Sequence, residues 1–462
     1  MRLAWFSPMP PVRTGVAAVS AEVVAALARE HLIDVYTDTV GSGLSTAGQS
    51  AHDFVWRHRQ QPYDLIVYQV GNSSHHDYIW PYLFRYPGLT VLHDAHLHHA
   101  RAAALLRTKR LQDYRAEFTA SHPDVNPDLA ELAVAGFDNH LYYSWPMTRL
   151  VIERSKLVAV HSRPLADSLR EAYPRTPIEA LRLAHGEPIA PDRTHEARAY
   201  ARMKHGIRPE AVLFGVFGGL TPEKRVGQVL DAFPAVLPYA PAAHLLLAGT
   251  PAEHFDVLAA IRERHLEPHV TVTGYLRDDE LADHFAACDV SINLRWPTAR
   301  EVSGPWLRAL AAGLPTITTD LAHMADVPSL DPRTWTPREA AGSWQLAAGS
   351  DRANREPRAA ECDPVTVAID ILDEDHSLRL AMRRLATDAA LRESLGTSAR
   401  AYWDREHSMP GMVDDYRRVI ARGASLPPPG PPLPAHLVDD GDSTLRALLA
   451  PFDIDGDNVF PG

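Results

Sequence analysis

The sequence predicts an α/β fold with two doubly wound, Rossmann-like lobes, each built on a parallel sheet. Short apolar runs alternate with amphipathic helical stretches in both halves of the chain, which is typical of βαβ units. The chain has 462 residues, of which 45% are hydrophobic. Because a single core rarely grows beyond about 250 to 300 residues, we expect two globular domains.

Six apolar runs in the first half of the chain are expected to form strands. They cover residues 3–6, 33–36, 65–70, 90–92, 157–160 and 180–183. After the first run, prolines stiffen a loop that ends at Gly15, and apolar residues at helical spacing follow. This order places Gly15 where a parallel sheet binds its ligands. The alternative is an entry turn that contacts no ligand.

The second half of the chain repeats this alternation. Its expected strands cover residues 212–217, 245–248, 270–273, 290–294 and 316–318, residues 377–422 have a helical pattern, and residues 426–434 form a semi-rigid proline-rich spacer. The expected domains are an N-terminal lobe at 1–185, an interdomain linker at 186–210, a C-terminal lobe with terminal helices at 211–422, and a tail at 423–462. The tail has one short amphipathic segment at 444–449, and we expect no catalytic role for it.

Composition excludes several classes of protein. The formal charge of -12 and the lack of a long basic run argue against a nucleic-acid partner. With only Cys288 and Cys362, neither a disulfide framework nor a thiolate metal site is expected. The sequence has no run of 18 apolar residues, so we expect no membrane span. The N-terminal apolar run is too short for a signal peptide. We therefore expect a cytoplasmic protein whose membrane contact, if any, is peripheral at the inner surface.

Two loops of the second half are candidates for binding a phosphorylated ligand. Residues 294–320 read as a strand end, a charged loop with Glu301, a helix opening at Gly304, and a second strand. Residues 215–225 read as a strand, a glycine turn and two cations, Lys224 and Arg225. Glycines let a backbone approach a diphosphate, amide groups point at its oxygens, and a cation neutralises its charge. The alternative for the second loop is a plain glycine turn with solvated cations.

Polar residues at the ends of two first-half strands are further candidates. His93 and Asp94 follow one strand, in the run that continues through His96, His98 and His99. Imidazoles and a carboxylate at strand carboxyl ends lie on the ligand side of a parallel sheet. No second cluster completes a tetrahedral set of ligands, and the run 453–457 lacks the spacing of a calcium loop. No metal and no cofactor are expected.

These motifs together resemble family 4 of the retaining nucleotide-sugar glycosyltransferases. The resemblance covers most of residues 1–422 and is strongest over 212–320. Members commonly have Gly-Arg-Leu-x-x-x-Lys, in which the Lys maps onto Lys224. Gly219 stands where the Arg is expected, so that diphosphate contact is missing or comes from a neighbour such as Arg225 or Arg295.

The second family motif has two glutamates eight positions apart before Ala-x-Ala-x-Gly-x-Pro. Residues 309–315 set the register, which places Glu301 one residue after the expected first glutamate and Arg308 at the second. The first usually contacts the transferred sugar and the second the ribose. Because Arg308 cannot accept hydrogen bonds, ribose recognition must differ. Arg308 either contacts phosphate or pairs with a nearby carboxylate as a structural residue.

The resemblance implies the GT-B fold, with two lobes facing across a cleft, and a metal-independent, hexosyltransferase-type transfer that retains anomeric configuration. The donor would be a nucleotide diphosphate sugar, and the acceptor would be a hydroxyl of a saccharide, a lipid-linked molecule or a small metabolite. His93 and Asp94 resemble a His-Asp pair near the reacting sugar. The implied catalytic residues are His93, Asp94, Glu301 and Lys224. The implied donor-binding residues are Gly15, Gly218, Gly219, Lys224, Arg225, Tyr275, Leu276, Arg295, Ser303, Gly304 and Arg308.

Three alternatives stay open at this point. After Gly274, the backbone at Tyr275 and Leu276 resembles the family's base-reading element, but Tyr275 could instead pack as core in a routine turn. A GT-B epimerase or hydrolase would need carboxylate bases near the sugar, and no carboxylate pair is evident in the matched segments. A catalytically degenerate sugar-nucleotide-binding partner protein would fit Gly219 and Arg308. The sugar, the base, the acceptor and the oligomeric state cannot be read from the sequence.

Overall fold

The computed structural model describes residues 1–38, 48–137, 141–187, 191–253, 255–338, 363–430, 432–439 and 442–454. Cys362 and the end of the 453–457 run lie outside these residues. The chain divides into two compact units. Unit 1 consists of residues 1–160, 169–179 and 417–462, and unit 2 consists of residues 161–168 and 180–416. The two units are described separately below.

Unit 1 contains a seven-stranded sheet in the order β3-β2-β1-β4-β5-β6-β7. The strands are β1 Arg2–Phe6, β2 Leu32–Thr37, β3 Gln49–Ser50, β4 Leu65–Val70, β5 Leu89–Leu92, β6 Leu157–Val160 and β7 Ile178–Ala180. The central strand β4 is buried along its whole length and pairs in parallel with β1 and β5. Such two-sided burial explains its mostly apolar sequence, which is interrupted only by Gln69. Strand β7 ends at Ala180, whereas the sequence predicted a strand at 180–183. Residues 181–183 therefore follow the strand and do not form it.

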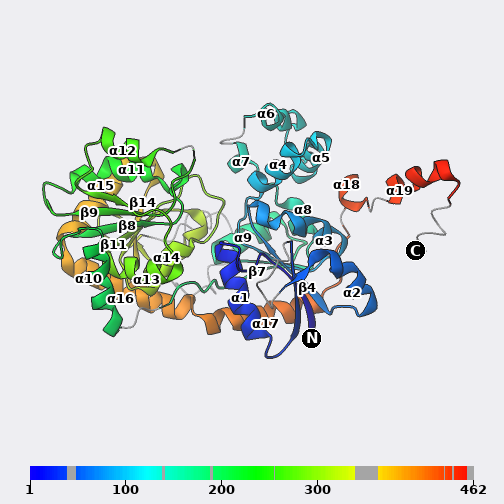
Figure 1. Cartoon of the computed structure of the whole chain (residues 1–462), viewed down its shortest axis with the longest axis horizontal. Helices are drawn as coiled ribbons and strands as arrows, with labels where there is room; N and C mark the ends of the chain where they lie inside the picture. The colour runs from blue at the N-terminus through cyan, green and yellow to red at the C-terminus, as the bar shows by residue number, and fades with distance from the viewer. Residues whose placement is uncertain are drawn as a thin grey trace, which may run out of the picture. The chain divides into compact units, whose positions relative to one another are not determined.

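The helices of unit 1 are α1 Gly15–Leu27, α2 Phe54–Gln60, α3 Trp80–Arg85, α4 His98–Arg107, α5 Leu111–Ser121, α6 Ala130–Val134, α7 Leu141–Ser144, α8 Arg149–Arg154 and α9 Arg163–Ala172, with short 3₁₀ turns η1 Ala51–Asp53, η2 Ser74–Ile79 and η3 Pro127–Leu129. Figure 1 shows α1 and α3 beside the strands of unit 1, and α4 to α7 grouped beyond the end of the strands. Helix α1 begins where Thr14 accepts a hydrogen bond from the amide of Ala17, which satisfies one of its free N–H groups. Helices α4 to α7 form a satellite core around Tyr114 and Phe118.

Unit 2 repeats this architecture with the strand order β10-β9-β8-β11-β12-β14-β13. Its strands are β8 Leu213–Phe217, β9 His244–Ala248, β10 Val270–Val272, β11 Val290–Asn293, β12 Thr316–Thr319, β13 Ser329–Leu330 and β14 Thr366–Ile369. Its helices are α10 Pro191–Lys204, α11 Val226–Ala232, α12 Val257–Glu263, α13 Asp278–Ala287, α14 Gly304–Ala311, α15 Glu374–Thr387 and α16 Ala389–Glu406, with 3₁₀ turns η4 Pro222–Lys224, η5 Phe233–Ala235, η6 Ala322–Met324 and η10 Ile371–Asp373. The paired strands of both sheets run parallel. The loops that follow the strands therefore lie at one edge of each sheet.

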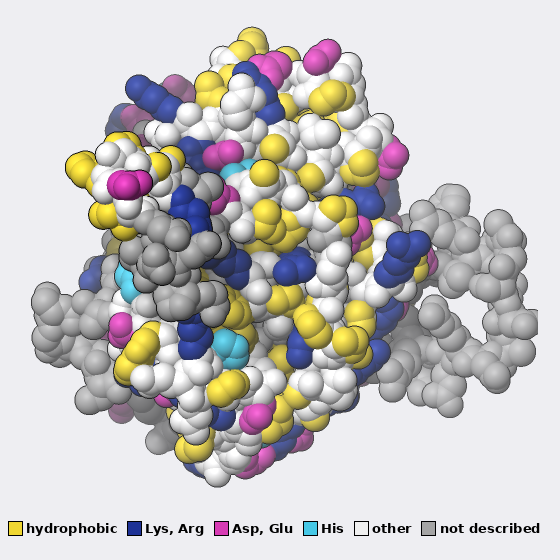
Figure 2. Space-filling model, turned by 90° about the vertical axis from the view of Figure 1, so that its right-hand side faces the viewer, with side chains coloured by type: hydrophobic (Ala, Val, Ile, Leu, Met, Phe, Trp, Pro, Cys, Tyr) yellow, Lys and Arg dark blue, Asp and Glu magenta, His cyan; other side chains and the backbone are white. Residues whose placement is uncertain are grey.

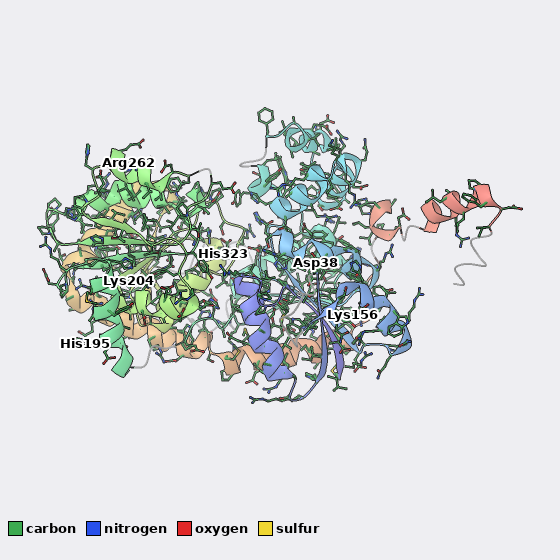
Figure 3. The ribbon with its side chains drawn as sticks, viewed as in Figure 1. Asp38, Lys156, His195, Lys204, Arg262 and His323 are labelled. Atoms are coloured by element: carbon green, nitrogen blue, oxygen red, sulfur yellow. The ribbon has the colours of Figure 1, made fainter. Side chains whose placement is uncertain are left out.

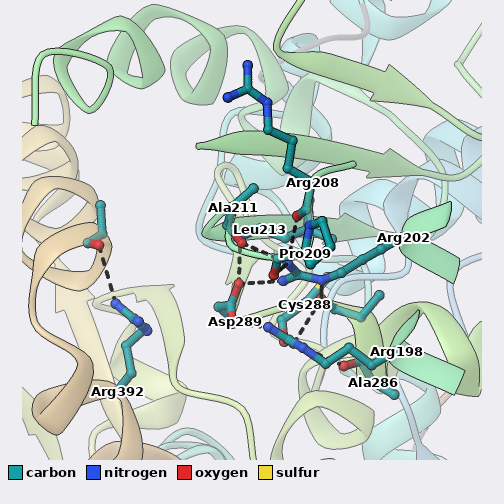
Figure 4. Close-up of polar contacts among 12 residues, drawn as sticks. Arg198, Arg202, Arg208, Pro209, Ala211, Leu213, Ala286, Cys288, Asp289 and Arg392 are labelled. Carbon is teal, nitrogen blue, oxygen red and sulfur yellow. Dashed lines mark hydrogen bonds and ion pairs between the residues drawn. The ribbon is translucent and has the colours of Figure 1, made fainter. Parts of the chain in front are cut away.

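Most of the segment expected as a linker is helix α10, which packs on α13 within unit 2. Figure 4 shows how two arginines fix it. Arg202 is only 3% exposed and donates to Asp289 Oδ2 at 2.7 Å, while Arg198 donates to Asp289 Oδ1 at 2.6 Å. Arg202 also donates to four backbone carbonyls, including that of Ala287 at the end of α13. Proline and charge at the start of the segment suggested a linker, whereas these tertiary contacts make it a helix of unit 2.

The C-terminal part of the chain returns to unit 1. Helix α17 Met409–Ser425 begins in unit 2, and the chain from Arg417 onward groups with unit 1. Arg418 and Arg422 both pair with Glu179 there. The spacer then follows unit 1, where Arg154 donates to the Pro429 carbonyl at 2.8 Å.

The tail has short helices α18 Ala435–Val438 and α19 Asp442–Leu449 and the 3₁₀ turn η11 Ala450–Phe452. Helix α18 packs on α3, buries Leu437 and places His436 Nε2 2.7 Å from Glu117 Oε1. Figure 2 faces this end of the molecule and shows Lys and Arg side chains interspersed with hydrophobic side chains. In the described part of the chain, no helix combines the length and apolarity that a bilayer crossing requires.

Candidate functional site

The glycine turn after β8 forms the first wall of the candidate site. Gly218 adopts φ of 86°, which favours glycine, and a side chain there would collide with Lys224 Nζ. Lys224 lies in η4 and folds back so that its Nζ donates to the Phe217 carbonyl at 2.6 Å. Gly219 follows in open surroundings. The turn therefore holds a lysine ammonium at the carboxyl end of β8.

The loop between β11 and α14 forms the second wall. The amide of Trp296 donates to the Glu223 carbonyl at 2.8 Å, which joins this loop to η4. Pro305, in the first turn of α14, lies 3.5 Å from the point where a Cβ on Gly218 would stand. Because β8 and β11 are neighbours in the sheet, the two loops share one edge. The start of α14 and the lysine turn are thus adjacent.

Lys224, Arg295 and Glu301 form one charged cluster at this edge. Arg295 Nε lies 2.7 Å from Glu301 Oε1, and Thr298 Oγ1 donates to Glu301 Oε2 at 3.0 Å. Burial, together with the charge of the nearby Arg295, lowers the pKa of Lys224 to about 7, and Glu301 partly opposes this shift. With two cations next to a single carboxylate, the cluster has an excess of positive charge that favours an anionic ligand.

Arg225 is paired with a carboxylate of unit 2. It sits at the start of α11 with φ of 57°, and its Nε donates to Glu374 Oε1 at 2.8 Å, with a second bond from Nη2 to Oε2. Such a two-pronged pair holds a guanidinium firmly in place. Arg225 thus anchors α11 to the start of α15, whereas Arg295 is the arginine next to Lys224.

Arg308 also has structural partners. Its Nε donates to His185 Nε2 at 3.0 Å, and its Nη2 lies 3.2 Å from Asp278 Oδ1. Burial, helped by the charge of Arg308, lowers the pKa of His185 to about 4, so the imidazole is a neutral acceptor. A Cβ on Gly304 would lie 3.0 Å from the His185 ring. Of the two readings of Arg308, pairing with a carboxylate is the one seen in this structure.

The remaining candidates of unit 2 lie on the same sheet edge. Ser303 caps α14 by accepting from the amide of Trp306, although at a long 3.4 Å. Gly274 has φ of 70° after β10, Leu276 packs on the apolar cluster under α10 and α13, and Tyr275 is 55% exposed. Tyr275 is therefore not a core residue, and the competing interpretation of this turn is wrong on that point.

In unit 1, His93 and Asp94 lie side by side after β5. His93 Nε2 is 2.8 Å from Gln69 Oε1, and Asp94 Oδ2 accepts from the amide of Asn72 at 2.7 Å. Asn72 in turn caps α4, because its Oδ1 accepts from the amide of Ala100. These hydrogen bonds thus join the loops that follow β4 and β5 at one edge of the sheet. Gly15, at the start of α1, is exposed with open space around it.

The other histidines after β5 have structural surroundings. His98 is fully buried, its Nδ1 donates to the Trp145 carbonyl at 2.7 Å, and its Nε2 accepts from Tyr114 at 2.8 Å. Burial lowers the pKa of His98 to about 3, so it stays neutral. Within the described ranges, no group of three or more His, Cys, Asp or Glu side chains could hold a metal ion.

Three site residues were missed by sequence reasoning: His185, Thr298 and His323. His323, labelled in Figure 3, is buried in η6, and its Nε2 lies 3.1 Å from the Glu301 carbonyl. A lone histidine after a strand has no signature that separates it from a surface residue. Thr298 lies three residues before Glu301, and that spacing is the one local signal available.

A cavity of about 460 Å³ lies apart from these loops, within unit 1. It is bounded by η2, α3, α4 and α18, and its lining includes Trp80, Arg101 and Leu437. Arg101 stacks over the Trp80 ring at 4.4 Å and forms a buried pair with Glu117 at 2.5 Å. The buried cation of this wall, Arg101, is thus paired with a carboxylate.

Comparison with known sequences identifies the domain that contains the cluster. Residues 211–334 match the family described as glycosyl transferases group 1. A relative from Frankia casuarinae, UDP-N-acetylglucosamine--N-acetylmuramyl-(pentapeptide) pyrophosphoryl-undecaprenol N-acetylglucosamine transferase, is 30% identical over 156 residues. The aligned stretch is 33% of this chain and 39% of the relative, so the chain spans about two fifths of that protein's length.

Solved structures share the fold over nearly the whole chain. WaaG, a glycosyltransferase involved in lipopolysaccharide biosynthesis, aligns over 90% of this chain and 99% of its own, with a TM-score of 0.57 and 15% identity. HepE of Anabaena in complex with UDP-glucose aligns over 91% and 99%, with a TM-score of 0.58 and 13% identity. The catalytic domain of starch synthase IV from Arabidopsis thaliana aligns over 92% and 99%, with a TM-score of 0.55 and 14% identity. Residues 211–334 therefore match the model of the group 1 glycosyl transferases, and the chain has the two Rossmann-like units of the GT-B fold.

Proposed function

We propose that the protein is a retaining glycosyltransferase of family 4 that moves a sugar, of hexose type, from a nucleotide diphosphate sugar to an acceptor hydroxyl. The observation that carries this proposal is the meeting of Lys224, Arg295 and Glu301 where β8 and β11 end. Loops at this edge of a parallel sheet are the usual place for a phosphorylated ligand. A departing nucleoside diphosphate needs cations, and a sugar needs hydrogen-bond acceptors, and the cluster offers both.

Lys224 and Arg295 stabilise the leaving diphosphate in this proposal. Fixed cations aimed at developing charge lower a barrier because they need not reorganise during the reaction. Arg295 supplies the second positive charge in this proposal because it lies near Lys224, whereas Arg225 is bound to Glu374 at the start of α11. With two side-chain cations in place, the proposed reaction needs no metal ion.

Glu301 orients the transferred sugar, and the edge of unit 1 handles the acceptor. Each oxygen of the Glu301 carboxylate has one protein partner, so each keeps capacity to accept a hydroxyl of the sugar. His93 and Asp94 would bind or polarise the reacting hydroxyls from their place after β5. Retention follows in this proposal from reaction on one face of the sugar, with the departing phosphate helping to take the acceptor proton.

The first donors to test are UDP sugars. HepE was solved with UDP-glucose, and the Frankia relative is named for UDP-N-acetylglucosamine. That relative is also named for an undecaprenol-linked acceptor, which supports a trial of lipid-linked acceptors beside saccharides and small molecules. We propose a cytoplasmic location with peripheral contact at the inner membrane surface on the same ground.

The experiment incubates the purified protein with a panel of nucleotide sugars and acceptors. Release of nucleoside diphosphate is followed in time, and the anomeric configuration of the product is read by NMR. Lys224→Ala should lower kcat by about 10²- to 10³-fold, the cost of losing one preorganised donor at a transition state. The matched control is Lys204→Ala, which removes a lysine from the surface of α10 and should leave kcat unchanged.

Each outcome decides between the proposal and its rivals. Inversion of configuration would contradict the retaining mechanism, and equal kcat for Lys224→Ala and Lys204→Ala would remove Lys224 from the site. Hydrolysis or epimerisation without any acceptor would favour the GT-B epimerase or hydrolase. Tight nucleotide binding with no transfer would favour a binding protein that has lost catalysis.

A further inference from the structure

The backbone that presents Glu301 is held at several points within unit 2. The amide of Arg295 donates to Thr319 Oγ1 at 3.0 Å, which fixes the start of the loop to β12. Arg300, the residue before Glu301, has φ of 60°, a left-handed conformation that is unfavourable for a non-glycine residue. A loop keeps such a conformation only when surrounding contacts enforce it. The contacts around Arg300 and Glu301 are therefore of interest.

The hydroxyl of Thr298 has a single arrangement that satisfies both of its neighbours. The amide of Arg300 lies 2.9 Å from Thr298 Oγ1, and an amide can only donate. The hydroxyl proton is then directed at Glu301 Oε2, 3.0 Å away, and an ionised carboxylate can only accept. Thr298 thus links the strained backbone at Arg300 to the direction in which the Glu301 carboxylate faces.

His323 holds the backbone of Glu301 from the other side. Its Nε2 lies 3.1 Å from the Glu301 carbonyl, which can only accept, so Nε2 bears the proton. Burial lowers the pKa of His323, so the ring is neutral. His323 is 5% exposed and lies in η6, and the hydroxyl of Ser162 donates to the backbone carbonyl of His323. Hydrogen bonds consequently hold both the carboxylate and the backbone carbonyl of Glu301.

We propose that Thr298 and His323 are positioning residues that aim Glu301 at the transferred sugar. This inference rests on the proposed function and adds residues to it. Thr298 donates to Glu301 Oε2, whereas Arg295 reaches Glu301 through the other carboxylate oxygen, Oε1. Loss of the Thr298 hydroxyl therefore affects the sugar and not the diphosphate. The separation of these two effects is what a test can measure.

The experiment compares Thr298→Val, which removes the hydroxyl at nearly constant shape, with Thr298→Ser, which keeps it. Affinity for UDP, affinity for UDP-glucose or for the donor found active in the panel, and kcat/KM are measured for each. Thr298→Val should keep the UDP affinity of the wild type within about twofold and lose about 10- to 100-fold in kcat/KM, the value of a hydrogen bond to a charged group. Thr298→Ser should stay within about threefold of the wild type.

His323 is tested in the same way. His323→Gln keeps a donor that can reach the carbonyl, and His323→Leu removes it, so His323→Leu should lower kcat/KM more than His323→Gln while both bind UDP. Thr298→Val with wild-type kcat/KM, or with UDP affinity and kcat/KM lowered equally, would overturn the inference and leave the proposed function standing. A wild-type protein that binds no nucleotide and turns over no donor would overturn the proposed function, and the inference with it.

Discussion

Donor binding should draw a proton onto Lys224. The pKa of this lysine is lowered to about 7 in the free protein, chiefly because its ammonium is buried and because Arg295 lies near it. A diphosphate next to the ammonium supplies the opposite charge that the free site lacks. The bound form therefore favours the protonated lysine and raises its pKa, so that we expect the bound lysine to be charged at pH 8.

The size of this effect follows from the pKa of about 7. At pH 8 about nine tenths of the free lysine is neutral, so binding should take up about 0.9 proton, whereas at pH 6 it should take up about 0.1. The affinity should accordingly fall about tenfold between pH 6 and pH 8. A nucleotide sugar is the ligand to use, because its diphosphate is esterified at both ends and has no monoester proton that titrates in this range.

Isothermal titration calorimetry in two buffers of different ionisation enthalpy measures the uptake directly. Lys224→Met should bind more weakly and take up no proton at pH 8. Lys204→Met, from the exposed pair with Glu280, should behave as the wild type. Binding at pH 8 without proton uptake, or equal uptake by Lys224→Met, would refute the reasoning.

Further predictions concern stability and metal dependence. Because burying the charged Lys224 destabilises the folded state, Lys224→Met should raise the free energy of unfolding at pH 7 by about 2–4 kcal/mol, a range discounted for partial exposure of the side chain. This gain should shrink as the pH rises toward 10.5, which chemical denaturation at several pH values measures. Arg202→Met should lower the free energy of unfolding by about 3–5 kcal/mol, since it strands Asp289 and four carbonyls, whereas Arg262→Met on the exposed face of α12 should change it by under about 0.5 kcal/mol. Transfer activity should be the same before and after treatment with a chelator, and a loss of activity that a divalent ion restores would contradict the proposed metal independence.

Much of the fold is legible in the sequence because parallel strands leave a strong local pattern. Strand β4 lies at residues 65–70, as its mostly apolar run predicts. The weaker predictions are those in which tertiary contacts override the local pattern. Helix α10 begins at a proline in a charged segment, yet Arg202 and Asp289 make it part of unit 2. The tail likewise docks through His436 on Glu117, a partner 319 residues away that no local pattern shows.

The candidate site shows the same division. Glycine at 218 and a lysine six residues later are a local signal, and the structure brings them together through a positive φ and a folded-back side chain. Which arginine accompanies Lys224 is not a local question. Arg225 is drawn away by Glu374, and Arg295 is brought near by the pairing of β8 with β11. The roles assigned to all of these residues stay predictions until a ligand is bound.

The most direct test of the account is a crystal structure of the protein with a bound nucleoside diphosphate. The account predicts phosphate oxygens within about 3 Å of both Lys224 Nζ and the Arg295 guanidinium, with the terminal phosphate facing Glu301. A diphosphate bound elsewhere, for example in the cavity beside Trp80, or bound in unit 2 without contact to Lys224, would contradict it.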